Sequence, residues 1–176
     1  MKLQEVEKLA VEVCMKQNGH IPQLIMCGKK GNSIIVLSNF PTDSKEKMKI
    51  MTEAGVKTAI FEKDKIGELE KVFFISEMWY SVQKKNIMSF IAPSKDPQKK
   101  EVLLISELNV LDDREKVSYF NIKRKENNRI TNIQKIGITP AKTKSYLLKA
   151  FINAYYFAIL KKNEMNSNIK KKIIIN

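Results

Sequence analysis

Residues 71–105 read KVFFISEMWYSVQKKNIMSFIAPSKDPQKKEVLLI. This stretch holds the only tryptophan of the chain, its densest group of aromatic residues and two strongly apolar runs, which are joined by a segment with two prolines. Short runs of aromatic and β-branched residues favour β-strands, whereas proline interrupts them. We therefore expect Lys71–Val82 and Glu101–Leu108 to be the central strands of a sheet.

The chain before this centre begins with an amphipathic helix and a hairpin. Apolar residues recur at helical spacing over residues 3–18, and Asn18-Gly19 is a typical helix stop. Two short apolar runs, at residues 23–27 and 33–37, are separated by a glycine-containing polar segment. This arrangement predicts a β-hairpin.

A second helix is expected over residues 44–62. Asp43 supplies a capping side chain before it, and apolar residues fall on one face. Gly55 leaves an alternative open, in which the helix ends early and residues 56–61 form a short strand. Residues 64–70 are a polar connection into the first central strand.

The chain after the centre predicts a meander and a long helix. Three β-type runs are separated by short polar turns, at residues 101–110, 115–124 and 129–138. Thr139-Pro140 then resembles a helix start, and a broad apolar stripe follows over residues 140–162. Residues 163–176 form a basic tail without helical periodicity, which we expect to be mobile.

These elements predict an α+β fold, with one domain over residues 1–162. The sheet is mainly antiparallel with a three-strand meander, and it is packed by an N-terminal helix, a middle helix and a long C-terminal helix. The helix at residues 140–162 is also a candidate homodimer interface.

Composition excludes several classes of protein. The 176 residues are 43% hydrophobic and 29% charged, which is typical of a globular chain. No apolar stretch approaches the roughly 20 residues that a membrane-spanning helix needs. Cys14 and Cys27 lack metal-ligand spacing, so we expect free thiols, a cytoplasmic location, and no metal or cofactor.

The net charge of +13 is concentrated in the second half of the chain. Residues 1–80 carry +1, whereas residues 81–176 have 20 Lys or Arg and 8 Asp or Glu, giving +12. Such a surface attracts polyanions, so nucleic acid or an acidic protein is the candidate partner. A/T-rich coding, which favours Lys, Asn and Ile, is an alternative explanation of the charge.

Basic and aromatic residues interleave near residues 119–129, a pattern that suits phosphate contacts and base stacking in single strands. A solvated hairpin tip is the alternative interpretation. The candidate partner-binding residues are Tyr119, Lys123, Arg124, Lys125 and Arg129, together with Lys170, Lys171 and Lys172 in the tail.

Catalytic signatures are weak. The glycines of Gly28–Ser33 lack the spacing of a phosphate-binding loop. The candidates for a small hydrolase or a ligand-binding enzyme are His20, Glu77, Asp96 and Glu101, which could bind a metal or transfer protons. Their spacing matches no diagnostic motif, so a non-catalytic binding module is our leading hypothesis and an enzyme is the alternative.

Strand alternation places Phe73, Ile75, Glu77 and Trp79 on one face of the first central strand. One carboxylate on such an apolar face needs a partner. Glu77 and Trp79 therefore form a candidate pocket; the alternative is a carboxylate near a strand end that pairs with a lysine.

Residues 72–79 and 93–102 together resemble a pattern of small uncharacterised prokaryotic proteins. In these proteins a strand that ends in Ser-Glu-x-Trp precedes a proline-bracketed loop and Asp-Pro-x-Arg/Lys-x-Glu. The resemblance implies no particular activity. It implies only that Glu77, Trp79, Asp96, Pro97 and Glu101 form one local group. This chain departs from the pattern at Lys99 and Lys100, where an arginine is usual.

Overall fold

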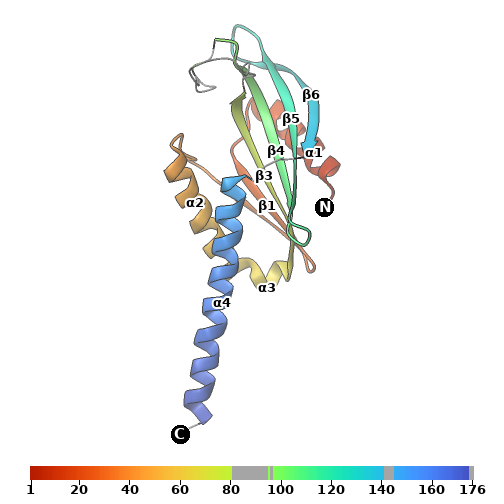
Figure 1. The fold of residues 1–176 in the computed structure, drawn as a ribbon. Coiled ribbons are helices and arrows are strands. Elements are labelled where there is room, and N and C mark those ends of the chain that lie inside the picture. The colour runs from red at the N-terminus through yellow and green to blue at the C-terminus, as the bar shows by residue number, and fades with distance from the viewer. Residues whose placement is uncertain (81–94, 96, 141–144, 175–176) are drawn as a thin grey trace.

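The structure is a computed structural model that describes residues 1–80, 95, 97–140 and 145–174. The helices are α1 (Leu3–Gln17), α2 (Ser44–Lys57), the π-helix η1 (Thr58–Glu62), α3 (Lys63–Ile66) and α4 (Tyr146–Ile174). The strands are β1 (Gln23–Gly28), β2 (Asn32–Val36), β3 (Leu69–Tyr80), β4 (Lys100–Asn109), β5 (Arg114–Arg124) and β6 (Ile130–Pro140). The predicted α+β class is confirmed, because helices pack on a six-stranded sheet (Figure 1).

The sheet has the order β2-β1-β3-β4-β5-β6, and neighbouring strands pair antiparallel. Strands β3 and β4 lie at its centre, as the sequence predicts, with Ile75 opposite Ile105. The β4–β5–β6 meander and the β1–β2 hairpin are also confirmed.

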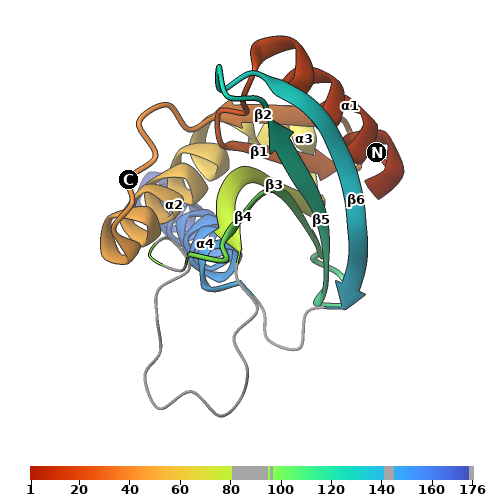
Figure 2. The same cartoon turned by 90° about the horizontal axis from the view of Figure 1, so that it is seen from above.

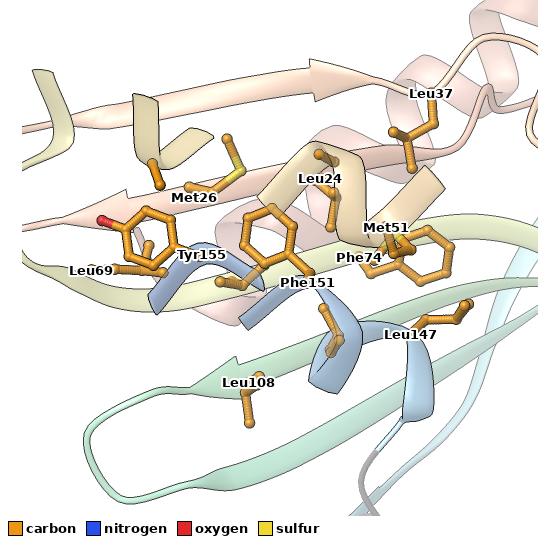
Figure 3. Packing of buried hydrophobic residues seen from close by; sticks show 14 of the residues in the cluster. Leu24, Met26, Leu37, Met51, Leu69, Phe74, Leu108, Leu147, Phe151 and Tyr155 are labelled. Atoms are coloured by element: carbon orange, nitrogen blue, oxygen red, sulfur yellow. The ribbon is translucent and has the colours of Figure 1, made fainter. Parts of the chain in front are cut away.

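Alternation along the strands divides the core between the two faces of the sheet. On one face, apolar residues of α2 and α4 pack on the sheet around Phe74; Figure 3 shows Phe151 and Tyr155 of α4 in this cluster. On the other face, α1 buries Val6, Ala10 and Cys14 against the side chains that neighbour Phe73. Seen from above, α1 lies across the sheet from α2 and α4 (Figure 2). The α1 face carries the candidate site.

The long C-terminal helix starts and ends later than expected. Thr139 and Pro140 belong to β6 rather than to a helix start. β6 is an edge strand, where the missing N–H of proline is tolerated. The helix instead starts beside Glu115, whose carboxylate accepts a hydrogen bond from the Ser145 N–H at 2.6 Å. It continues to Ile174 and projects past the sheet (Figure 1), so the backbone of residues 163–174 is helical.

The middle helix does not break at Gly55, so the short-strand alternative for residues 56–61 is wrong. It continues through η1 into α3, which occupies part of the expected connection. A Cβ atom on Gly55 would lie 2.3 Å from the Phe151 carbonyl oxygen. Glycine at this position therefore allows α2 and α4 to approach closely.

Candidate functional site

Arg124, at the end of β5, is the centre of a polar cluster on the α1 face. Its Nε and Nη2 donate to the two carboxylate oxygens of Glu101, each at 2.8 Å. Nη2 also lies 3.4 Å from Glu77 Oε2. Nη1 donates to the carbonyl oxygens of Asn18 at 3.2 Å and Asn128 at 3.1 Å. One guanidinium thus joins β3, β4, the β5–β6 turn and the end of α1.

The second carboxylate oxygen of Glu77 contacts the end of α1. This oxygen, Oε1, accepts the His20 backbone N–H at 2.6 Å and lies 3.4 Å from the Cys14 sulfur. Burial raises the pKa of the Glu77 carboxyl, while hydrogen bonds from Cys14 and His20 oppose that shift. Burial, with the nearby Glu77 charge, raises the pKa of the Cys14 thiol to about 12, which removes thiolate chemistry at neutral pH.

The structure brings together three of the four predicted catalytic residues, although one of them only through its backbone. Glu77 and Glu101 share Arg124, and His20 joins them by its N–H. The fourth, Asp96, lies outside the described residues. Glu77 is paired, as the alternative interpretation has it, but its charged partner is an arginine rather than a lysine.

Within the part of the chain that the structure describes, no group of three His, Cys, Asp or Glu side chains could hold a metal ion. The position between Glu77 and Glu101 is taken by the Arg124 guanidinium. The imidazole of His20 is buried, with no hydrogen-bond partner for Nδ1 among the described residues. The arrangement is therefore suited to fixing backbone segments.

The β5–β6 turn is one of the segments that this cluster fixes. The Lys125 N–H donates to the Arg129 carbonyl at 3.0 Å, and the Asn128 N–H donates to the Lys125 carbonyl at 2.9 Å. Asn128 has φ +62°, a left-handed conformation that asparagine tolerates. From α1, Asn18 Oδ1 accepts the Ile130 N–H at 2.6 Å. The turn is therefore fixed by its own backbone hydrogen bonds and by the Asn18 side chain at the end of α1.

This turn and the adjoining end of β5 present cations to solvent. The side chains of Lys123, Lys125 and Arg129 are exposed, whereas the side chain of Arg124 is only 16% exposed and engaged with carboxylates. Of the four cations predicted to bind a partner here, three are thus accessible and one supports the turn.

An exposed aromatic residue lies at the same end of the sheet. Trp79 is 42% exposed, and in the β3–β4 register it is opposite Glu101, the residue that binds Arg124. The Lys99 ammonium lies 4.6 Å from the centre of the Trp79 ring, a cation–π distance. Lys100 is also exposed, but it is opposite Tyr80 in the register, so strand alternation directs it to the other face of the sheet.

We call the side chains of Trp79, Lys99, Lys100, Lys123, Lys125 and Arg129 the basic sheet end. The sequence predicted its hairpin part but not the contribution of Trp79 and Lys99. The information that was missing is the strand register, which places residues 79 and 101 side by side, with residue 101 bound by Arg124.

The other predicted partner-binding residues lie elsewhere. Tyr119 is half-buried in β5, in register with Leu104 and Gly137. Lys170, Lys171 and Lys172 fall on the projecting part of α4 (Figure 1). They do not belong to the basic sheet end.

The residues of the resembling pattern are only partly brought together. Trp79 and Glu101 are neighbours in the sheet, and Glu77 and Glu101 share Arg124. Pro97 is exposed. Arg124, which pairs with these two carboxylates, lies on β5, outside the residues that carry the resemblance.

A cavity of about 420 Å³ lies between α3, α4 and the start of β3. It is lined by Lys30, Lys63, Leu69, Tyr155 and Tyr156, among others. None of the predicted site residues lines it, so the predicted Glu77–Trp79 pocket is not this cavity.

The fold and the cluster define an α+β protein with a polar, basic end of its sheet. No family model, curated protein or solved structure matches the chain. None of the described helices has the length and apolar composition needed to cross a bilayer. Function is therefore argued from the chemistry of the site.

Proposed function

We propose that the chain is a non-catalytic module that binds nucleic acid through the basic sheet end. The observation that carries the proposal is a pair of exposed cations, Lys125 and Arg129, on a turn whose backbone is fixed by Arg124 and Asn18, with Lys123 exposed on the adjoining end of β5. Cations on a fixed turn lose less conformational freedom when they bind phosphates than cations on a loose loop do.

The local charge supports a polyanionic partner. Residues 77–79, 99–101 and 123–129 contain six Lys or Arg and three Glu. Two of these carboxylates, Glu77 and Glu101, are partly neutralised by Arg124. Lys100, Lys123, Lys125 and Arg129 are exposed, so they can release counterions from a phosphate backbone.

The same contacts argue for binding rather than catalysis. A general acid or base must reach substrate, but Glu101 is held by two hydrogen bonds from Arg124 and Glu77 accepts the His20 N–H. Releasing either carboxylate would break contacts that hold the end of α1 and the β5–β6 turn.

The proposal is tested by fluorescence anisotropy with labelled single-stranded and duplex oligonucleotides, between about 50 and 300 mM salt. We expect the affinity to fall steeply with salt. A triple variant, K123Q/K125Q/R129Q, should weaken binding and reduce the slope of log K against log salt by about 2, since each lost phosphate contact on a single strand removes about 0.7.

The matched control removes three exposed lysines of α2, as K45Q/K49Q/K57Q. It changes the net charge equally but leaves the basic sheet end intact, so its salt slope should stay that of the wild type. Equal losses in both variants would show that only net charge matters. Absence of binding at low salt would overturn the proposal and direct the search to an acidic protein partner.

The lysines of the projecting helix need a variant of their own. Neutralising Lys170, Lys171 and Lys172 together tests whether they add to binding. The proposal assigns the main site to the sheet end, so this variant should keep most of the wild-type affinity. If it loses more than the turn variant, the binding surface lies on α4 instead.

A further inference from the structure

Trp79 is exposed where a strand of the sheet leaves the core. Along β3, Phe73 and Ile75 are buried, Glu77 is half-buried, and Trp79 is 42% exposed. Part of this large aromatic ring is therefore accessible to a ligand, and aromatic rings are efficient contact surfaces.

The surroundings of the ring indicate the chemistry of what covers it. The Lys99 ammonium lies 4.6 Å from the centre of the ring. The carboxylate of Glu101, which is opposite Trp79 in the sheet, is bound by Arg124. A ligand on this ring therefore meets an aromatic surface with positive charge around it.

We propose that Trp79 stacks on an unpaired base and that the nucleic-acid partner is therefore single-stranded. This inference rests on the proposed function and names its substrate class. Bases in a duplex are stacked on each other and present no free face, whereas the bases of a single strand stack on exposed aromatic rings.

The spacing between Trp79 and the cations fits one continuous nucleic-acid strand. Trp79 on β3 is two strand spacings, about 10 Å, from β5, and in the strand register Lys125 lies about three residues, or another 10 Å, further along the chain. A single strand can place a base on Trp79 while phosphates a few nucleotides away reach Lys125 and Arg129. Lys99 shares the ring face with the incoming base, so it moves from the ring to a phosphate on binding. A stacked base contributes more than the exposed cation–π contact that it replaces.

The chain offers a direct probe, because Trp79 is its only tryptophan. We would titrate the full chain with oligodeoxythymidylate of about 12 nucleotides and with a duplex of the same length, recording tryptophan emission and anisotropy together. The single strand should quench the emission, with the same midpoint in both signals. It should bind at least about 10-fold more tightly than the duplex.

Substitution gives the second arm. Trp79→Ala should weaken single-strand binding about 10-fold, which is the loss of one stacked base, and Trp79→Phe should recover part of it. The matched control is Phe157→Ala on α4, because Phe157 is also exposed and also carries a lysine over its ring, with Lys161 Nζ at 5.8 Å. This control should bind like the wild type.

The two proposals fail in different ways. Salt-sensitive anisotropy without tryptophan quenching, or with equal affinity for duplex, overturns the stacking role and leaves the basic sheet end as a phosphate-binding surface. No anisotropy change with any oligonucleotide overturns both. If the alanine variant does not fold, Trp79→Phe and the wild-type emission still decide the outcome.

Discussion

At the residue scale, His20 is an unusual group in the cluster at the end of α1. Its side chain is 8% exposed, and Nδ1 lacks a hydrogen-bond partner within the described structure. Burial lowers the pKa of this imidazole from its ordinary value of 6.5. The folded protein therefore holds His20 neutral at a pH where the unfolded chain takes up a proton.

This difference sets the sign of a pH effect. As the pH falls below about 6.5, the unfolded chain binds a proton that the folded chain does not. The contribution of neutral His20 to the free energy of unfolding therefore decreases as the pH falls from about 6.5 toward the lower pKa of the folded protein. His20→Gln, which is neutral throughout, should lose less stability than the wild type between about pH 7.5 and 5.5.

Two measurements check this prediction. Urea unfolding of both proteins at the two pH values gives the stability difference. NMR titration of the imidazole gives its pKa directly, without assignment, because His20 is the only histidine. An imidazole that titrates at or above 6.5 in the folded protein contradicts the prediction.

The charged residues of the cluster could be predicted individually but not as a group. Strand alternation correctly placed Glu77 on the same face as Phe73 and Ile75. The same rule, applied to Phe120, Ile122 and Arg124, puts Arg124 on the α1 face of the sheet rather than with the solvent-exposed cations. What the sequence lacked was the register between strands, which depends on tertiary packing.

At the element scale, the contact between α2 and α4 depends on Gly55. Substitution with alanine would place a methyl group 2.3 Å from the Phe151 carbonyl oxygen and 3.1 Å from the Ala154 Cβ. In an isolated helix this change is favourable by up to about 1 kcal/mol. Here we expect a net loss of about 1–3 kcal/mol, since the two helices must separate.

The prediction is checked by chemical denaturation, with Gly137→Ala as the matched control. A Cβ on Gly137 meets nothing within 4 Å, and this residue lies in the edge strand β6. The control should change the unfolding free energy little. If Gly55→Ala is as stable as the wild type, the close packing of α2 on α4 is not as described.

The elements were predicted well where a residue pattern is strong and locally determined. Helix α1 ends at Asn18 in a left-handed cap, and Asp43 caps α2 by accepting the N–H groups of Lys45 and Glu46. Thr139-Pro140 misled the prediction of α4 because proline suits both a helix start and an edge strand. Only the order of strands in the sheet distinguishes these two uses.

At the scale of the whole molecule, the predicted partner-binding cations fall in two separate parts of the chain. One group belongs to the basic sheet end, and residues 170–172 belong to the projecting part of α4 (Figure 1). The apolar stripe that was the candidate dimer interface packs on α2 through Leu148, Phe151 and Tyr155. Dimerisation through the remaining exposed residues of α4, such as Phe157 and Leu160, stays a prediction.

Binding of a single strand at the basic sheet end can be mapped on the folded chain. We would record amide and indole NMR shifts of the labelled protein while adding a short single-stranded oligonucleotide. The largest changes should fall on the Trp79 indole N–H, on Lys99 and Lys100, and on residues 123–129. Changes concentrated on α4 or around the cavity at Tyr155, or no changes at all, would contradict binding at the basic sheet end.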